Sequence, residues 1–479
     1  MVNNKNQTLS ILMRIKLCIF PTRNRIPMMA VNKQKANLSR RNFLARGCGF
    51  LASLFLNTSC SDNVTGPVVS NQSPLQSPEP QSPEPASEDQ VDVIVVGAGL
   101  SGLVAAYELV RAGYDVRVLE ASNKAGGRAQ TLREPFDSGL IAEAGPARIP
   151  PDHDLTLGYI DHFGIETSPF YTQEGEYLIV SNQEVRQRHT PGSFLSGNRN
   201  MWVKIPTGTD SLPMAFTGSL GDRVQIGSPV TRVVRDGNGV VVSYGNSSVG
   251  KELRGSKLIC TVPLPVINKI NFDPLLSGPK RAAFEATSYT DVTRVYVQYG
   301  GRIWEEDGLN GWGLSYVDGY QEIWHPTWNQ EGPRGVLMSY MYGGMAREVA
   351  AMGPGVIVPI FINRFDHLFP GSRELAEQGT YFAWEQQPWI GAAFAQSNPP
   401  FSEHPELASP EGPIHFAGEH ASGHRGWMQG AFESGLRAAS EIDSTVTGER
   451  RPRTAVAISR RQLVGYLAGT SDVPAWLVG

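Results

Sequence analysis

The apolar positions of this chain follow their clearest pattern between residues 91 and 119. Residues 91–96 form a nearly continuous apolar run, which is typical of a strand buried on both faces. Residues 103–112 place apolar side chains at helical spacing, Gly113 ends that segment, and residues 114–119 return to a strand pattern. This order of strand, helix and strand predicts a parallel β-α-β unit.

The same patterns predict a helix and a hairpin further along the chain. A helix is expected at residues 155–163, and the sequence from there to residue 207 is irregular and polar. Residues 230–234 and 240–244 are apolar runs on either side of Asp236-Gly237-Asn238-Gly239, which is a strong signal for a hairpin turn. Residues 258–262 predict a buried strand in which Cys260 acts as a small hydrophobe.

The later part of the chain differs in composition. Much of the aromatic content lies in residues 275–400, and we expect this region to form a substrate domain, although each aromatic ring taken singly is more often a core residue. An amphipathic stretch at residues 458–467 predicts a packing helix. The aromatic residues of the region are Trp304, Trp312, Trp324, Trp328, Tyr340, Tyr342, Trp384 and Trp389.

A glycine-rich turn follows the first strand. Gly97, Gly99 and Gly102 have G-x-G-x-x-G spacing, in which the first glycine permits a tight turn, the second a close approach to a pyrophosphate, and the third close helix packing. Glu120 lies 18 residues beyond Gly102, where it can accept hydrogen bonds from a ribose. The alternative is an ordinary β-α-β unit with a tight turn, but the order of the elements favours a dinucleotide site.

Length and composition exclude several classes of protein. The chain has 479 residues and a formal net charge of −4, which suits two or three domains and gives no basic field for nucleic acid. Its four cysteines have neither metal-ligand spacing nor a disulfide framework. No run of 18 apolar residues occurs, so no membrane-spanning helix is expected.

The N-terminal segment carries a sorting signal. Residues 1–38 have no fold signal, and Met28 or Met29 could equally be the start. Residues 39–44, Ser-Arg-Arg-Asn-Phe-Leu, match the twin-arginine export pattern, although an Arg-Arg pair also arises by chance in a basic tail. We expect residues 39–60 to be a signal that leads to the periplasm.

Cys60 is either a lipid-attachment site or lies near a simple cleavage site. Residues 61–89 contain six prolines and repeat Gln-Ser-Pro, which indicates a disordered or polyproline linker. Such a linker would reach roughly 90 Å when extended. It suits a tether, so we expect a membrane-bound lipoprotein that Cys60→Ala would release.

Three segments together resemble one enzyme family. Residues 93–128 are similar to the N-terminal signature of flavin-containing amine oxidases, and residues 414–439 are similar to their C-terminal signature. Gly145-Pro146-Ala147-Arg148-Ile149-Pro150 resembles a segment of the L-amino-acid oxidase branch. The resemblance implies an α/β fold: an FAD-binding Rossmann-like domain of glutathione-reductase type with a discontinuous α+β substrate domain.

The resemblance also implies domain boundaries. The FAD-binding domain would comprise residues 90–150, 208–274 and 405–445. Residues 151–207 and 275–404 would form the substrate-binding domain, with residues 446–479 as a C-terminal tail. The insertion at 151–207 looks shorter than in many amino-acid oxidases, so we expect more open substrate access.

Cofactor contacts are carried over residue by residue. Glu419 would bind the ribityl or pyrophosphate region, Val224 the adenine through its backbone, and a helix at 428–442 would point its N-terminus at the flavin. No cysteine lies near the C-terminal motif, so non-covalent FAD is expected. The implied FAD-binding residues are Gly97, Ala98, Gly99, Leu100, Ser101, Gly102, Glu120, Ala121, Gly127, Arg128, Gly145, Ala147, Arg148, Val224, Glu419, Gly426, Trp427 and Met428.

Arg148 decides the substrate class that the resemblance implies. In the amino-acid oxidase branch the matching arginine clamps the substrate carboxylate, which suits the planar fork of a guanidinium. The alternative is a structural ion pair with Glu143 or another acid. Gly426 and Trp427 would complete the amine side, and Trp324 and Trp384 are the best candidates for lining the pocket.

Arg294 departs from the family pattern. It lies where relatives carry a lysine that holds a water near flavin N5, and an arginine stays charged and is bulkier. Slow reaction with oxygen, or use of another electron acceptor such as a quinone, therefore becomes an alternative. The catalytic candidates are thus Arg148, Arg294 and Trp427. For His420 and His424, hydrogen bonding near the flavin is favoured over a metal site.

The resemblance implies oxidative deamination of L-amino acids with hydrogen peroxide as a product. The alternatives are a monoamine or polyamine oxidase, a flavin dehydrogenase that uses a non-oxygen acceptor, and a flavin-binding protein without turnover. The expected partners are an amino acid or amine and dioxygen, without nucleic acid or a resident metal. The sequence leaves side-chain preference and oligomeric state open.

Overall fold

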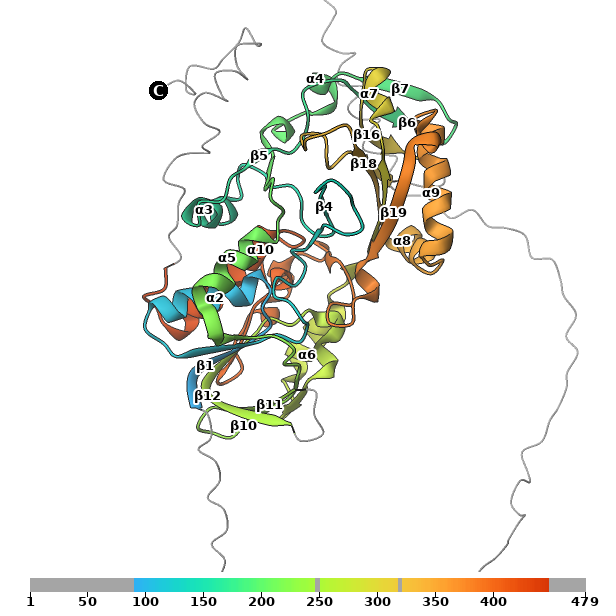
Figure 1. Ribbon diagram of the computed structural model, residues 1–479. Helices are drawn as coiled ribbons and strands as arrows, with labels where there is room; N and C mark the ends of the chain where they lie inside the picture. The colour runs from blue at the N-terminus through green and yellow to red at the C-terminus, as the bar shows by residue number, and fades with distance from the viewer. Residues whose placement is uncertain (1–89, 246–249, 318–320, 448–479) are drawn as a thin grey trace, which may run out of the picture. The chain divides into compact units, whose positions relative to one another are not determined.

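The structure is a computed structural model that describes residues 90–245, 250–317 and 321–447 (Figure 1). The predictions for the twin-arginine signal, Cys60, the linker at 61–89 and the helix at 458–467 lie outside the described residues. Within those ranges, no helix has the length and apolar character needed to span a membrane.

The first sheet has eight strands in the order β13-β10-β11-β12-β1-β2-β9, with β21 also paired to β12. β1 lies between β2 and β12 and is parallel to both, which confirms the predicted β-α-β unit. β10 and β11 are antiparallel, which confirms the predicted hairpin. The strands are β1 (Gln90–Val96), β2 (Val116–Leu119), β9 (Val224–Gln225), β10 (Val230–Arg235), β11 (Val240–Tyr244), β12 (Lys251–Cys260), β13 (Asn271–Asp273) and β21 (Ile414–Phe416).

Helices from distant parts of the sequence cover one face of this sheet (Figure 1). They are α2 (Leu100–Arg111), α3 (Asp154–His162), α5 (Ser211–Leu220) and α10 (Met428–Ile442), and α3 corresponds to the helix predicted at 155–163. Two glycines explain how closely they pack. A Cβ on Gly102 would lie 2.0 Å from the Gly97 carbonyl oxygen, and one on Gly435 would lie 2.3 Å from the Ser101 oxygen.

The second sheet has seven strands in the order β19-β15-β18-β17-β16-β6-β7. β15 lies between β19 and β18 and is buried along its whole length. The strands are β6 (Glu176–Val180), β7 (Arg186–His189), β15 (Val292–Tyr299), β16 (Leu309–Ser315), β17 (Gln321–Trp324), β18 (Gly335–Tyr342) and β19 (Ala376–Ala383).

The two faces of the second sheet have different environments because side chains alternate along each strand. Val295 and Ile323 belong to a core cluster under α8 (Gly343–Ala350) and α9 (Pro354–Leu368), which lie alongside β19 in Figure 1. Tyr296 and Trp324 belong to an aromatic cluster on the opposite face. That aromatic face also meets residues 136–147, which connect to the first sheet.

The prediction of irregular sequence between the helix near residue 160 and residue 207 is wrong in part. β6 and β7 form an antiparallel hairpin there and extend the second sheet. The β7 sequence Arg-Gln-Arg-His carries no apolar alternation because it is an exposed edge strand. Charged side chains are a common protection of such edges. Cys260 is 3% exposed at the end of β12, as predicted.

Shorter elements complete the described chain. The short strands are β3 (Thr131–Leu132), β4 (Ala142–Glu143), β5 (Ser168–Pro169), β8 (Val203–Lys204), β14 (Tyr289–Thr290) and β20 (Phe394–Ala395). The remaining α-helices are α4 (Pro191–Phe194), α6 (Gly278–Ala286), which lies between β13 and β14 in the sequence, and α7 (Ile303–Glu306).

Candidate active site

A cavity of about 400 Å³ is lined by the glycine-rich turn after β1 and by the aromatic face of the second sheet. We call the part formed by the turn and the end of β2 the nucleotide end. We call the part formed by Arg148, Arg294, Trp324, Tyr340 and Tyr342 the substrate end. The volume of the whole cavity is within the usual range for ligand pockets.

The backbone at the nucleotide end leaves room for a phosphate. A Cβ built on Gly99 would find no atom within 4 Å, so the space before the N-terminus of α2 is open. Gly97 has a φ of +105°, a conformation that glycine adopts without strain. The first N–H groups of a helix have no partner within the helix, so an open helix N-terminus fits the pyrophosphate of a dinucleotide.

Glu120 is fixed at the C-terminal end of β2. Its carboxylate accepts hydrogen bonds from the backbone N–H of Ala98 at 2.7 Å and of Ser122 at 2.9 Å. The hydroxyl of Ser122 donates a further bond at 2.8 Å. Glu120 is 7% exposed and lines the cavity, so it can accept further bonds from a ribose there.

Glu419 joins four segments beside the cavity. Its carboxylate accepts hydrogen bonds from Arg128 at 2.7 Å, from the N–H of Gly426 at 2.8 Å and from the N–H of Ala395 at 3.1 Å. Burial alone would raise the pKa of Glu419, but Arg128 and the N–H donors outweigh burial and lower it. The carboxylate therefore stays ionised and holds the Gly426 turn in place.

Trp427 precedes α10 and lies at the junction of the two ends. Its ring meets the edge of His153 at a centroid distance of 4.9 Å and that of Trp202 at 5.9 Å. Trp427 and Met428 both line the cavity. The N-terminus of α10 thus faces the cavity, where its partial positive charge favours an anionic group.

Arg148 is held between two tryptophans and a carboxylate. Its guanidinium carbon lies 5.1 Å from the ring centroid of Trp324 and 5.6 Å from that of Trp202. Its Nη1 donates to Glu322 at 3.2 Å. Glu322 also accepts bonds from the indole N–H of Trp324 and the hydroxyl of Tyr342, both at 2.9 Å.

The ion pair expected as the alternative for Arg148 is present, with Glu322 as the acid rather than Glu143. The Glu143 carboxylate instead accepts hydrogen bonds from the Thr131 hydroxyl at 3.0 Å and the Thr209 N–H at 2.8 Å. Burial raises the pKa of Glu143 to about 7.

Arg294 faces the cavity from the middle of β15. It shares a strand face with Tyr296, which belongs to the aromatic cluster. Its Nη1 donates to the backbone carbonyl of Glu143 at 2.7 Å, and its guanidinium lies 4.3 Å from the Tyr340 ring and 5.2 Å from the Trp324 ring. Arg294 is 4% exposed, and its Nε has no hydrogen-bond partner.

Most of the predicted site residues line this one cavity. Ala98 and Gly102 lie outside the lining and act through the Glu120 bond and helix packing. Val224 also lies outside it, on β9, and its N–H is donated to the Gly221 carbonyl. The predicted residues in the lining are Gly97, Gly99, Leu100, Ser101, Glu120, Ala121, Gly127, Arg128, Gly145, Ala147, Arg148, Arg294, Trp324, Trp384, Glu419, Gly426, Trp427 and Met428.

Glu322 and Trp202 are site residues that were not predicted from the sequence. Glu322 lies two positions before Trp324 on β17, and alternation along a strand puts both side chains on one face. With Trp324 predicted to line the pocket, that spacing is a signal that points to Glu322 as well. Trp202 lies in the stretch that was predicted to be irregular, and no local pattern connects it to Arg148.

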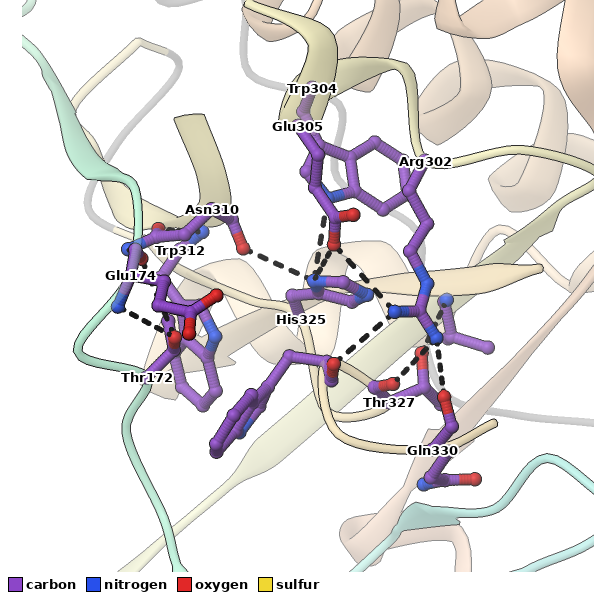
Figure 2. Close-up of polar contacts among 12 residues, drawn as sticks. Thr172, Glu174, Arg302, Trp304, Glu305, Asn310, Trp312, His325, Thr327 and Gln330 are labelled. Atoms are coloured by element: carbon purple, nitrogen blue, oxygen red, sulfur yellow. Dashed lines mark hydrogen bonds and ion pairs between the residues drawn. The ribbon is translucent and has the colours of Figure 1, made fainter. Parts of the chain in front are cut away.

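A buried polar network fixes the end of β17 (Figure 2). Arg302 donates to the backbone carbonyls of Thr327 at 3.1 Å and Gln330 at 2.7 Å, and it also binds those of Trp328 and Arg334. His325, directly after β17, contacts the Asn310 carbonyl oxygen at 3.1 Å. Burial lowers the pKa of His325 to about 3. The strand that carries Glu322 and Trp324 is therefore anchored at its exit.

The two histidines of the C-terminal motif have separate environments. His420 is 3% exposed, and burial lowers its pKa to about 4. His424 lies 2.7 Å from Glu433. In the part of the chain that the structure describes, no group of three or more His, Cys, Asp or Glu side chains is arranged to hold a metal ion.

Comparisons with known proteins agree with this geometry. The family model of flavin containing amine oxidoreductases matches residues 100–206 and 192–443. YobN of Bacillus subtilis (strain 168) is 27% identical, over 75% of this chain and 96% of that protein. The L-amino-acid oxidase of Siganus canaliculatus is 26% identical, over 73% of this chain and 85% of that protein.

Solved structures show the same fold. Putrescine oxidase bound to putrescine has a TM-score of 0.64 at 21% identity, and cyclohexylamine oxidase from Brevibacterium oxydans IH-35A has one of 0.65 at 19% identity. Each alignment covers 74% of this chain and 99% of the other. The predicted FAD-binding Rossmann-like fold with a substrate domain is thus confirmed. Because the family model matches more than half of its length, this chain belongs to the flavin-containing amine oxidoreductases and is an FAD-dependent enzyme.

Proposed function

We propose that the enzyme oxidatively deaminates L-amino acids to 2-oxo acids, ammonia and hydrogen peroxide. The observation that carries this proposal is the charge of the substrate end, where two guanidiniums, Arg148 and Arg294, line the cavity. Among the described residues, the acids in the cavity lining are Glu120 and Glu419, and both already bind N–H donors. Such a lining suits a substrate that carries a carboxylate.

Arg148 is well placed to bind that carboxylate. A guanidinium has five N–H donors, and one of them is used by Glu322. The two tryptophan rings and Glu322 restrict its rotation, so little side-chain entropy is lost on binding.

The remaining groups of the site orient the substrate and exclude water. Trp384 and Trp427 supply apolar walls, and the Gly426 carbonyl is a candidate acceptor for the substrate amine. FAD, when bound, would supply the hydride acceptor for the substrate α-carbon. The protein's part is to hold that C–H bond in a reactive position.

The second candidate is a monoamine or polyamine oxidase. Glu322 favours it, because a carboxylate near the cavity could bind a substrate ammonium. However, Glu322 already accepts bonds from Arg148, Trp324 and Tyr342, and it is absent from the cavity lining. Because these partners already use the Glu322 carboxylate, the arrangement supports an amino-acid substrate better.

Anaerobic reduction of the flavin tests the proposal. The full-length holoenzyme is mixed with L-amino acids and, in parallel, with the amines that they give on decarboxylation. Loss of flavin absorbance with the amino acids alone supports the proposal. Loss with the amines alone assigns the enzyme to the amine oxidases and makes Arg148 structural.

The electron acceptor needs a separate measurement. Arg294 in place of the lysine of relatives leaves open an acceptor other than oxygen. Reoxidation of the reduced flavin by oxygen and by a soluble quinone is compared directly. Fast reoxidation by oxygen supports an oxidase, and fast reoxidation by the quinone alone supports a dehydrogenase.

We further propose export by the twin-arginine route, followed by lipid attachment at Cys60, on the basis of the sequence alone. Membrane fractionation tests this in cells that express the full chain or its Cys60→Ala variant. The full chain should pellet with membranes and the variant should not. A fully soluble parent protein would contradict the lipid anchor.

A further inference from the structure

The substrate end holds one guanidinium more than its ion pairs account for. Arg148 is paired with Glu322, so together they contribute no net charge. Arg294 has no ion pair with a carboxylate in the described part of the chain; its Nη1 is bonded to a backbone carbonyl. Arg294 is 4% exposed, its Nε is unpartnered, and an arginine does not lose its proton in a protein.

The groups that face Arg294 do not neutralise it. The phenols of Tyr296 on β15 and of Tyr340 and Tyr342 on β18 are its main electrostatic neighbours. The Glu143 carboxyl on β4 is held by Thr131 and Thr209, and burial raises its pKa to about 7, so it is only partly ionised at neutral pH. A buried, unpaired cation is costly, and a ligand anion would remove that cost.

We propose that Arg294 is a second substrate-binding residue, which holds the substrate carboxylate together with Arg148 and favours the neutral form of the substrate amine. The inference rests on the proposed oxidation of L-amino acids. Both guanidinium carbons lie near the Trp324 ring, at 5.1 and 5.2 Å from its centroid, and both residues line the same cavity. The single excess positive charge matches a carboxylate beside an uncharged amine.

The charge matters because only the neutral amine can give up its α-hydrogen as hydride. A free amino acid carries an ammonium at neutral pH, and this group must lose one proton to solvent before the carbon–hydrogen bond breaks. A nearby cation disfavours the ammonium and lowers its pKa. Arg294 would therefore act on the substrate before oxygen takes part.

Binding of two substrate fragments, measured without oxygen, tests the first half of the proposal. The probes are 4-methylpentanoate, which is leucine without its amine, and isopentylamine, which is leucine without its carboxylate. Their dissociation constants for the holoenzyme are measured by titration calorimetry. Arg294→Gln should weaken 4-methylpentanoate roughly ten-fold or more and leave isopentylamine unchanged or tighter.

A matched control is Arg334→Gln. Arg334 lies beside the same sheet, but its guanidinium is paired with Glu377, and neither residue lines the cavity. This variant should leave both dissociation constants unchanged. The FAD content and the melting temperature of each variant show whether it is folded and loaded. Equal binding of 4-methylpentanoate by wild type and Arg294→Gln would overturn the inference.

The pH dependence of anaerobic flavin reduction by leucine tests the second half. In Arg294→Gln the apparent pKa of the bound substrate should rise by about one unit, and Arg294→Lys, which keeps the charge, should restore it. Glu143→Gln shows whether the Glu143 carboxyl is the group that titrates. An effect of Arg294→Gln on flavin reoxidation alone would assign Arg294 to the oxygen reaction and overturn the inference.

The two proposals can fail separately. If isopentylamine but no amino acid reduces the wild-type flavin, the proposed function fails, and 4-methylpentanoate binding still reports on Arg294. If leucine reduces the flavin but Arg294→Gln changes neither carboxylate binding nor the pH profile, only the inference about Arg294 fails.

Discussion

Replacement of Arg148 by leucine should separate carboxylate binding from the rest of catalysis. The side chains of Arg148 and Glu322 are 23% and 15% exposed, so their charges are partly screened by solvent. Loss of one partner from a desolvated charge pair costs about 2–5 kcal/mol of binding. Because Arg294 keeps a cation at the substrate end, we expect the lower part of that range, about 2–3 kcal/mol, or roughly a 30- to 150-fold rise in Kd.

The assay is stopped-flow reduction of the holoenzyme's flavin under nitrogen, with an L-amino acid and its decarboxylated amine as paired substrates. The variant should lose affinity for the amino acid and keep its affinity for the amine. Arg148→Leu leaves Glu322 without its cation, so the double variant Arg148→Leu/Glu322→Gln distinguishes that local damage from the lost clamp. The double variant should bind the amino acid as weakly as Arg148→Leu does, because it also lacks the clamp. Equal effects on both substrates, or none on either, would refute the reasoning.

Three further predictions concern the cofactor, the fold and its pH dependence. Gly99→Ala should lower FAD content without lowering apoprotein stability, because the added Cβ meets no atom of the protein. Gly102→Ala should destabilise the apoprotein, because its Cβ would lie 2.0 Å from a backbone oxygen. Flavin absorbance measures the FAD content, and thermal melts of the apoproteins measure their stability. Arg302→Gln should cost roughly 2–4 kcal/mol in urea unfolding, because four backbone carbonyls lose their donor, and a cost under 0.5 kcal/mol would contradict the role of the network. Burial lowers the pKa of His325 from 6.5 to about 3, so neutral His325 contributes its full stability above pH 6.5. That contribution is lost as the pH falls toward 3, by up to about 1.4 kcal/mol per pH unit. His325→Gln should reduce this slope when the free energy of unfolding is measured against pH.

The parts of the fold that were predicted correctly are those with a local signal. The β1–α2–β2 unit, the β10–β11 hairpin and α3 each follow from periodicity and turn residues within a short window. α2 begins at Leu100, earlier than the predicted residue 103, because the glycine-rich turn itself forms the first helical turn. β7 could not be predicted because an exposed edge strand needs no apolar face.

The site residues also divide into those with a local sequence signal and those that depend on the order of the strands. The positions of Gly97, Gly99 and Glu120 follow from the spacing of one motif, since the motif's geometry is contained in one β-α-β unit. The Arg148–Glu322 pair joins residues 174 positions apart, and it depends on β17 lying between β16 and β18 in the second sheet. Strand order of this kind is decided by packing across the whole domain, so a motif search could find Arg148 but not its partner.

Glu419 connects the nucleotide end of the cavity to the turn beside the substrate end. Its carboxylate binds Arg128 beside the glycine-rich turn, and it also binds the N–H of Gly426, whose carbonyl is the candidate acceptor for the substrate amine. These donors come from segments almost 300 residues apart, so the arrangement exists only in the folded chain. A ligand that binds the folded state alone stabilises it in proportion to its affinity. FAD binding should therefore also stabilise the Gly426 turn, which we propose positions the substrate amine, and loss of the Glu419 carboxylate should weaken cofactor retention and substrate positioning together.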